Sequence, residues 1–189
     1  GRGSAEVLRA LGVNVDATRE VQARCLREAG VCFCFAIHHH PAMRHAAGPR
    51  ASLGVPTIFN LLGPLTNPAG ASHQLIGVYG PGLVGVVAGA LARLGSVRAM
   101  VVHSAEGMDE ISPCGPTRAA VVEGGRVSER TITPEEAGVE RTTMEEIRAG
   151  SLEGAVEMFR AVMGGERGGA RAAVLMNAGA ARWVAWAAG

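Results

Sequence analysis

The sequence has few aromatic residues and almost no net charge. Phe, Trp and Tyr make up 4% of the 189 residues, and the formal net charge is +1. A nearly neutral chain lacks the broad basic field that holds DNA or RNA without sequence preference. We therefore expect no nucleic-acid partner, although a few local groups could hold a small anionic substrate.

Long apolar runs and a signal peptide are also missing. No segment reaches the roughly 20 apolar residues of a membrane-spanning helix, and the stretch from Ala172 is interrupted by Asn177 and Arg182. The chain begins with Gly1 rather than Met, directly at a helix-start pattern. We expect no membrane partner, and we expect the chain to be truncated at its N-terminus.

Cysteine is scarce, and its spacing is uninformative. Cys25, Cys32, Cys34 and Cys114 form no paired CxxC clusters. This usage favours buried, reduced thiols in a cytosolic protein over a disulfide framework.

The residues that are abundant indicate a folded α/β protein. Hydrophobic residues make up 48%, charged residues 19%, and the 27 glycines are not clustered in runs. A chain of this length can bury one core, or one core with a short appendage. We see no repeat and no linker, so we predict one partial domain over 1–189, with helices in 1–30 leading into a sheet.

Local patterns predict the first elements. Ser4 should cap one helix and Thr18 should cap a second, Arg19–Ala29. The continuous apolar run Val31–Ile37 predicts a strand buried on both faces. Pro41 fits the first turn of a further helix.

Strand, helix and strand then follow in sequence, and their spacing predicts a right-handed parallel crossover. The three segments are Gln74–Tyr79, Gly82–Leu94 and Val97–His103. We therefore predict the α/β class, with a central, mainly parallel sheet flanked by helices.

The later part of the chain predicts a hairpin and three helices. Ala119–Val122 and Arg126–Ile132 read as strands joined by a turn at Glu123-Gly124-Gly125. Pro134 should start a helical turn. The predicted helices are Met144–Ala149, Leu152–Met163 and Ala170–Ala188.

An irregular stretch, Thr57–Gly70, is the first candidate for a binding site. Gly63 permits a close backbone approach to a ligand, and Pro64 restricts the loop shape. A rigid irregular loop suits a pocket wall. An ordinary structural loop stays open as the alternative.

Three histidines, His38–His40, follow the predicted buried strand, and Arg50 follows ten residues after His40. Ligands gather beyond the carboxyl ends of strands in α/β sheets, and an arginine there can bind a carboxylate with two parallel hydrogen bonds. A metal site with Cys32 and Cys34 is the rival hypothesis. It is less favoured because adjacent residues cannot all face one ion without strain.

Asp109 and Glu110 follow the strand that ends near His103. Paired carboxylates in such a loop suit Mg²⁺, which prefers oxygen ligands, keeps several waters and bridges to phosphates. A solvated acidic turn is the alternative.

The Gly3-Ser4 helix start could bind a phosphate through its free N–H groups, although simple capping is the plainer interpretation.

Three spaced motifs resemble the anthranilate phosphoribosyltransferase family, the second enzyme of tryptophan biosynthesis, over nearly the whole chain. They are Thr57–Pro68; Phe35-Ala36 with His40–Met43; and Val101–His103 with Gly107–Ser112. The resemblance implies the nucleoside phosphorylase/phosphoribosyltransferase-like large domain. It implies transfer of phosphoribosyl from phosphoribosyl pyrophosphate (PRPP) to anthranilate, with release of pyrophosphate.

The resemblance also implies roles for matched residues. Arg50 would hold the anthranilate carboxylate, while His40, Gly63 and Pro64 would shape the acceptor path. Binding would place amine and ribose in line, so no covalent nucleophile is expected. On the donor side, Asp109 and Glu110 would be Mg²⁺ ligands and Ser4 would close the PRPP site.

The sequence departs from the family pattern at Ile37, often proline, and at Ala172, often aspartate. The family's Gly-Thr-Gly-Gly-Asp and Lys-His-Gly-Asn segments are absent, as is most of its small helical domain, which supplies the dimer contact. We therefore expect little activity from this chain alone and a homodimer for the full-length enzyme. The resemblance implies a cytoplasmic location, or a plastid in a plant or alga.

Three rival functions stay open. A pyrimidine nucleoside phosphorylase-like enzyme shares the fold, but Arg50 and Asp109-Glu110 favour the transferase. A non-enzymatic nucleic-acid-binding relative should show a basic groove, which this composition argues against. The last rival is an inert pocket on a structural domain.

Overall fold

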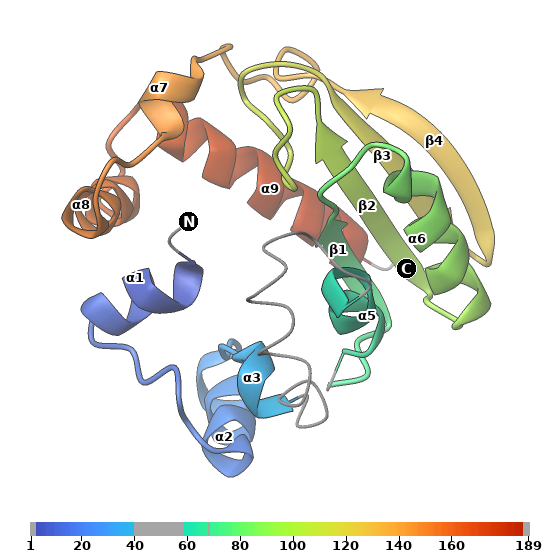
Figure 1. Ribbon diagram of the computed structural model, residues 1–189, viewed down its shortest axis with the longest axis horizontal. Helices are drawn as coiled ribbons and strands as arrows, with labels where there is room; N and C mark the ends of the chain where they lie inside the picture. The colour runs from blue at the N-terminus through green and yellow to red at the C-terminus, as the bar shows by residue number, and fades with distance from the viewer. Residues whose placement is uncertain (1–2, 40–58, 68, 187–189) are drawn as a thin grey trace. The chain divides into compact units, whose positions relative to one another are not determined.

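The computed structural model describes residues 3–39, 59–67 and 69–186 (Figure 1). The chain divides into two compact units: Gly1–Gly63 with Ala149–Arg160, and Pro64–Arg148 with Ala161–Gly189. We call them the helical unit and the sheet unit. The expectation of one partial α/β domain over 1–189 stays a prediction, because a domain can contain more than one compact unit.

The helical unit begins with α1 (Ser4–Ala10) and α2 (Arg19–Ala29). Thr18 caps α2 as predicted, since its side-chain oxygen accepts a hydrogen bond from the Val21 N–H at 3.4 Å. The predicted cap at Ser4 is wrong by one position. Gly3 has the extended backbone of the N-cap residue, and Ser4 is already helical. Glycine is itself an acceptable N-cap residue.

The predicted strand Val31–Ile37 is not formed. Residues 31–35 have neither helical nor strand structure, and α3 (Ala36–His39) begins within the predicted span. Val31 is 68% exposed, so the run is not buried on both faces. Part of the aromatic content clusters locally instead: the Phe33 and Phe35 ring centroids lie 6.1 Å apart, and Phe35 meets His38 edge-on at 5.7 Å.

The four cysteines are free, as expected, but their predicted burial is wrong. Cys25 and Cys34 are exposed, and Cys32 and Cys114 are partly buried. Cys25, Cys32 and Cys34 belong to the helical unit, and a small unit with few buried side chains leaves little room to enclose their thiols.

The predicted irregular stretch Thr57–Gly70 contains a helix, α5 (Phe59–Leu65), with Pro64 inside it. A proline near the end of so short a helix disturbs few backbone hydrogen bonds. Farther on, the Asn67 side-chain oxygen accepts from the Ala69 N–H at 2.9 Å, so an irregular turn does follow. The helix predicted from Pro41 lies outside the described residues.

The sheet unit contains the predicted parallel crossover. β1 (His73–Gly77), α6 (Leu83–Arg93) and β2 (Arg98–Ser104) follow one another, and the two strands pair in parallel, with Leu75 opposite Met100. The crossover is therefore confirmed, with boundaries shifted by a few residues at most.

The predicted hairpin is also confirmed. β3 (Thr117–Glu123) and β4 (Arg126–Ile132) pair antiparallel. Gly124 and Gly125 join them with φ of 54° and 75°, which suits the tight turns that match strand twist.

The strand order is β1-β2-β3-β4, and β2 pairs antiparallel with β3. The described sheet is thus mixed rather than mainly parallel. The reason is that residues 105–116 return the chain beside β2 without a crossover helix, and the hairpin adds a further antiparallel strand.

Helices cover both faces of this sheet (Figure 1). α6 buries Val84, Val87, Ala88 and Leu91 as it packs on β2 and β3. α9 (Gly169–Ala185) packs on β1 and β2, where Met176 and Val184 join one apolar cluster with Met100, Val102, Ile111, Ala119 and Val121.

Two further helices precede α9 in the chain. α7 (Met144–Ile147) packs against α9, and α8 (Leu152–Met163) continues from the helical unit into the sheet unit. No helix in the described part of the chain has the length and apolar content to span a bilayer.

Candidate functional site

A tight turn follows β2 and directs the loop that carries Asp109 and Glu110. Ser104, the last residue of β2, is fully buried. Its side-chain oxygen accepts from the Met108 N–H at 3.0 Å, and its own N–H donates to the Met108 carbonyl at 2.9 Å. Gly107 supplies the φ of 85° that this reversal requires. The turn therefore fixes the backbone position of Met108, the residue directly before the carboxylate pair.

Asn177 of α9 holds the other end of the same loop. Its side-chain oxygen accepts from the Ile111 N–H at 3.0 Å, and its side-chain amide donates to the Ile111 carbonyl at 2.8 Å. The same amide donates to the Ala173 carbonyl at 2.9 Å. We call this pairing the Asn177 clamp. It satisfies both backbone groups of a buried residue and fixes the loop to a helix far away in sequence.

Gly77, the last residue of β1, permits the loop to pass close to the sheet. A Cβ added at Gly77 would lie 1.6 Å from the Asp109 carbonyl oxygen. No side chain fits at that distance, so glycine is required here for a close backbone approach rather than for a positive φ.

A groove of about 410 Å³ lies beside this loop. One wall of the groove comes from the strands and carries Leu75, Gly77 and Val102. The other wall comes from α9. Asp109 and Glu110 also line the groove. The α9 wall consists of Ala173, Val174, Asn177 and Ala178. The groove thus lies where parallel strands β1 and β2 end, the position at which α/β sheets bind ligands.

The charge in this groove is acidic. Asp109 and Glu110 are exposed neighbours, and no ion pair found among the described residues involves either of them. Loss of hydration raises the pKa of the Glu110 carboxyl, and the Asp109 charge raises it further. Two carboxylates that repel one another would be stabilised by a cation between them.

The donor set fits Mg²⁺ better than a transition metal. In the described part of the chain no three His, Cys, Asp or Glu side chains gather as a metal cluster. Mg²⁺ is commonly held by one or two carboxylates and completes its shell with water and substrate phosphates. The pair therefore meets the requirement for a substrate-bridging ion.

His103, the histidine of the Val101–His103 motif, links the ends of the two strands. Its Nδ1 lies 2.8 Å from the Val78 carbonyl oxygen. The carbonyl can only accept, so Nδ1 carries the proton. His103 is 8% exposed, and its hydrogen bond holds the carboxyl ends of β1 and β2 together beside the groove.

The remaining predicted site residues lie elsewhere. Ser4 begins α1 in the helical unit, and Gly63 and Pro64 lie within α5, on either side of the boundary between the units. His40 and Arg50 lie outside the described residues. Asp109 and Glu110, which are adjacent in the sequence, are the predicted site residues that line the groove in the described part of the chain.

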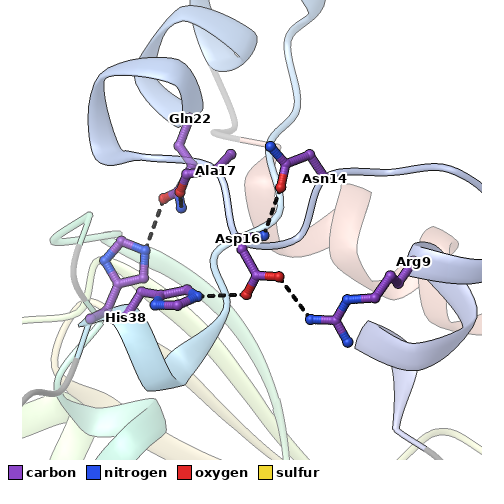
Figure 2. A network of polar contacts seen from close by, with 7 residues as sticks. Arg9, Asn14, Asp16, Ala17, Gln22 and His38 are labelled. Carbon is purple, nitrogen blue, oxygen red and sulfur yellow. Dashed lines mark hydrogen bonds and ion pairs between the residues drawn. The ribbon is translucent and has the colours of Figure 1, made fainter.

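The rival metal site at the three histidines finds no support in the two that are described. His38 Nε2 lies 2.8 Å from Asp16 Oδ1, and His39 Nε2 lies 2.8 Å from Gln22 Oε1. Figure 2 shows Asp16 between His38 and Arg9, whose guanidinium donates to the other carboxylate oxygen at 2.9 Å. The two rings are thus engaged by different partners.

Three residues of the site were not predicted from the sequence: Asn177, Gly77 and Ser104. Asn177 did leave a signal, since it is a polar residue that interrupts an otherwise apolar helix. A buried polar group in such a helix needs a hydrogen-bond partner. Gly77 and Ser104 gave no comparable signal, because their partners come from a loop whose path follows from tertiary packing.

Comparison with known proteins places these features in a family. Residues 1–188 match the family described as "Glycosyl transferase family, a/b domain". A protein of Thioalkalivibrio sulfidiphilus named anthranilate phosphoribosyltransferase is 51% identical over 187 residues, which are 99% of this chain and 55% of the relative. The chain therefore spans about half the length of the curated relatives it matches.

Solved structures agree. The crystal structure of anthranilate phosphoribosyltransferase from Thermus thermophilus aligns with a TM-score of 0.86 and 44% identity, over 97% of this chain and 54% of that chain. The Saccharomyces cerevisiae enzyme in complex with PRPP and Mg aligns with a TM-score of 0.81 over 93% of this chain and 51% of that chain, but at 24% identity it shows the fold alone.

These likenesses confirm the predicted fold class, with helices that flank a sheet as in the large domain of a phosphoribosyltransferase. The chain belongs to the glycosyl transferase family, and its residues 1–188 match the α/β domain by which that family is described.

Proposed function

We propose that the protein carrying this chain transfers the phosphoribosyl group of PRPP to anthranilate and releases pyrophosphate, the second step of tryptophan biosynthesis. The observation that carries the proposal is 51% identity over 99% of the chain to a protein named anthranilate phosphoribosyltransferase. The acidic groove at the ends of β1 and β2 supports it, because a pyrophosphate-releasing reaction needs a place for a cation.

We propose that Asp109 and Glu110 hold Mg²⁺ at this groove. Their adjacency, their lack of a cationic partner among the described residues and the raised pKa of Glu110 support this assignment. When bound, the ion supplies charge neutralisation at the phosphates of the donor. The two carboxylates orient it, and the Asn177 clamp together with the Ser104 turn holds their backbone in place.

On the acceptor side we propose that Arg50 binds the anthranilate carboxylate and that His40, Gly63 and Pro64 shape the acceptor path. Gly63 and Pro64 lie within α5. The resemblance of the motif Thr57–Pro68 to the family supports their assignment.

Three finer assignments rest on the same proposal. Ser4 would contact the PRPP side. The whole protein would act as a homodimer, and it would be located in the cytoplasm, or in a plastid in a plant or alga. No covalent nucleophile is required, because the anthranilate amine itself attacks the ribose when both substrates are held in line.

In the full-length protein, the loss of anthranilate fluorescence on addition of PRPP and Mg²⁺ tests the activity directly. Asp109→Asn combined with Glu110→Gln should lower turnover and remove most of its Mg²⁺ dependence, since both proposed ligands lose their charge. Glu106→Gln is the matched control, because it removes a carboxylate from the same loop and should leave the dependence unchanged. An unchanged Mg²⁺ dependence in the double variant would exclude the metal assignment.

A second assay separates the two substrate sides. Arg50→Ala should raise the KM for anthranilate far more than the KM for PRPP, whereas Arg93→Ala, at an exposed arginine of α6, should change neither. Phosphorolysis of thymidine in place of anthranilate transfer would instead support a pyrimidine nucleoside phosphorylase.

A further inference from the structure

Two cysteine side chains in the helical unit approach one another closely. The Sγ atoms of Cys32 and Cys34 lie 3.8 Å apart, within hydrogen-bonding distance for sulfur, and both thiols are free. A disulfide bond is about 2.0 Å long, so bond formation requires the two atoms to approach by roughly 1.8 Å. The other two cysteines, Cys25 and Cys114, show no contact with another thiol among the described residues.

The backbone between the two thiols can make this adjustment. A single residue, Phe33, separates them, and residues 31–35 belong to no helix or strand. No ladder of backbone hydrogen bonds therefore resists a local change of φ and ψ.

A short chain of hydrogen bonds orients the two thiols toward each other and toward Gln22. The Cys34 thiol donates to the Gln22 side-chain oxygen at 3.5 Å. That oxygen faces the sulfur because the Gln22 amide group donates to the Ala17 carbonyl at 2.8 Å. Since the Gln22 oxygen can only accept, Cys34 supplies the proton there, and Cys32 is left to donate to Cys34.

Gln22 also connects the pair to α3. Its side-chain oxygen lies 2.8 Å from His39 Nε2, and Gln22 is 5% exposed. Partial loss of hydration, and then the contact with Cys32, raise the pKa of the Cys34 thiol. This thiol must therefore lose its proton before its sulfur can attack a disulfide. The two thiols are thus ordered by one hydrogen-bond acceptor, the side-chain oxygen of the buried Gln22.

We propose that Cys32 and Cys34 are a redox-active dithiol that forms an intramolecular disulfide by exchange with a low-molecular-weight disulfide such as oxidised glutathione. One thiolate attacks a glutathione sulfur, the S–S bond of glutathione breaks, and the departing glutathione thiolate takes up a proton. The second thiolate attacks the protein sulfur of the mixed disulfide and expels the second glutathione. Two electrons pass from the protein to the reagent, and two glutathione thiols result.

Oxidation has a structural consequence at α3. The disulfide has no S–H to donate, so the Gln22 oxygen loses one of its two donors and keeps the contact with His39. This inference does not depend on the proposed transferase activity.

Peptide mapping of the full chain tests the proposal. The chain contains no lysine, so trypsin cuts only after arginine, and residues 28–44 form one peptide that contains Cys32 and Cys34 but neither other cysteine. After incubation in glutathione buffers and alkylation, this peptide should carry no alkyl group and should be lighter than the reduced, unalkylated peptide by two hydrogen atoms. Reduction before alkylation should restore two alkyl groups.

Serine variants give the matched comparison. The second thiol of the pair acts at an effective concentration on the order of millimolar or higher. Cys32→Ser and Cys34→Ser should therefore stay largely reduced, with some mixed disulfide, in the buffer that fully oxidises the wild type. Cys25→Ser should oxidise like the wild type, and far-ultraviolet circular dichroism checks that each variant is folded.

Three results would overturn the proposal, and each comes from the wild-type protein. The peptide 28–44 could retain two alkylatable thiols under oxidising glutathione. It could accumulate a stable mixed disulfide. Or the disulfide could join Cys25 or Cys114 instead.

Discussion

Single residues from two elements position the loop that carries the carboxylate pair. Gly77 of β1 removes a side chain where the Asp109 backbone passes, and Asn177 of α9 binds both backbone groups of Ile111. Neither residue carries a charge or a nucleophile. Their contribution is to hold Asp109 and Glu110 beside the groove, and it can be measured separately from any activity.

Replacement of Asn177 tests the clamp. Asn177→Ala leaves the buried N–H and C=O of Ile111 without their partner, which should lower the free energy of unfolding by about 1–3 kcal/mol. Asn177→Asp keeps an acceptor for the Ile111 N–H but sets a carboxylate oxygen against the Ile111 and Ala173 carbonyls, so it should also destabilise the protein. Arg182→Ala at an exposed position of the same helix should have little effect. Urea denaturation measures all three, and equal losses for Asn177→Ala and Arg182→Ala would contradict the role.

Replacement of Gly77 tests the close approach. Gly77→Ala places a methyl group against the Asp109 carbonyl and should destabilise the protein by about 1–3 kcal/mol through forced backbone shifts. Gly89→Ala is the opposite case. A Cβ there meets nothing within 4 Å, so the exchange inside α6 should stabilise by about 0.5–1 kcal/mol. Thermal unfolding should therefore shift in opposite directions for the two variants.

At the level of elements, sequence patterns predicted the helices, strands and turns that depend on residues close together in the chain. The crossover from Gln74 to His103 and the turn at Gly124-Gly125 depend on nearby residues, and both were predicted correctly. The strand at Val31–Ile37 was wrong because an apolar run forms a strand only where another strand is available to pair with it. The described strands all lie in the sheet unit. For the same reason the clamp could not be predicted: its partners are 66 residues apart.

Asp16 connects two helices of the helical unit and gives a pH-dependent prediction. Hydrogen bonds from His38 of α3 and then from Arg9 of α1 hold the pKa of Asp16 below its ordinary value of 3.8. A lowered pKa means that the carboxylate contributes stability above 3.8 and loses this contribution as the pH falls through the folded-state pKa. The effect should be small, because these side chains are largely exposed.

Comparison with Asp16→Asn isolates this contribution. The difference in free energy of unfolding between wild type and variant should be constant at neutral pH and should shrink as the pH falls below 3.8. Urea denaturation along a pH series measures it. A difference that grows toward acid pH would contradict the assignment.

Across the whole molecule, buried apolar side chains are distributed unevenly. Within the described residues the helical unit buries Ala5, Val15 and Val156, while the other buried hydrophobic residues all belong to the sheet unit. Because burial supplies most of the stabilising free energy, we expect the helical unit to open at lower denaturant concentration than the sheet unit.

Two spectroscopic probes can detect this order. Both tryptophans, Trp183 and Trp186, lie in the sheet unit, and the Arg98 guanidinium lies 5.0 Å from the Trp183 ring centroid. Tryptophan fluorescence therefore reports on that unit, whereas circular dichroism at 222 nm also reports on α1 and α2. The fluorescence transition in urea should have the higher midpoint, and coincident transitions would show one cooperative unit.

The Asn177 clamp also sets an order of events during protein synthesis. The ribosome releases the carboxylate loop before it releases α9, and domains fold from the N-terminal side as they emerge. Until residue 177 has been translated and has left the exit tunnel, water takes the place of the Asn177 side chain at the Ile111 backbone groups. A nascent chain that stops before α9 lacks Met176 and Val184 of the apolar cluster, one wall of the acidic groove and the contact that holds its carboxylates. The groove is therefore a late product of translation, although its charged residues are made early.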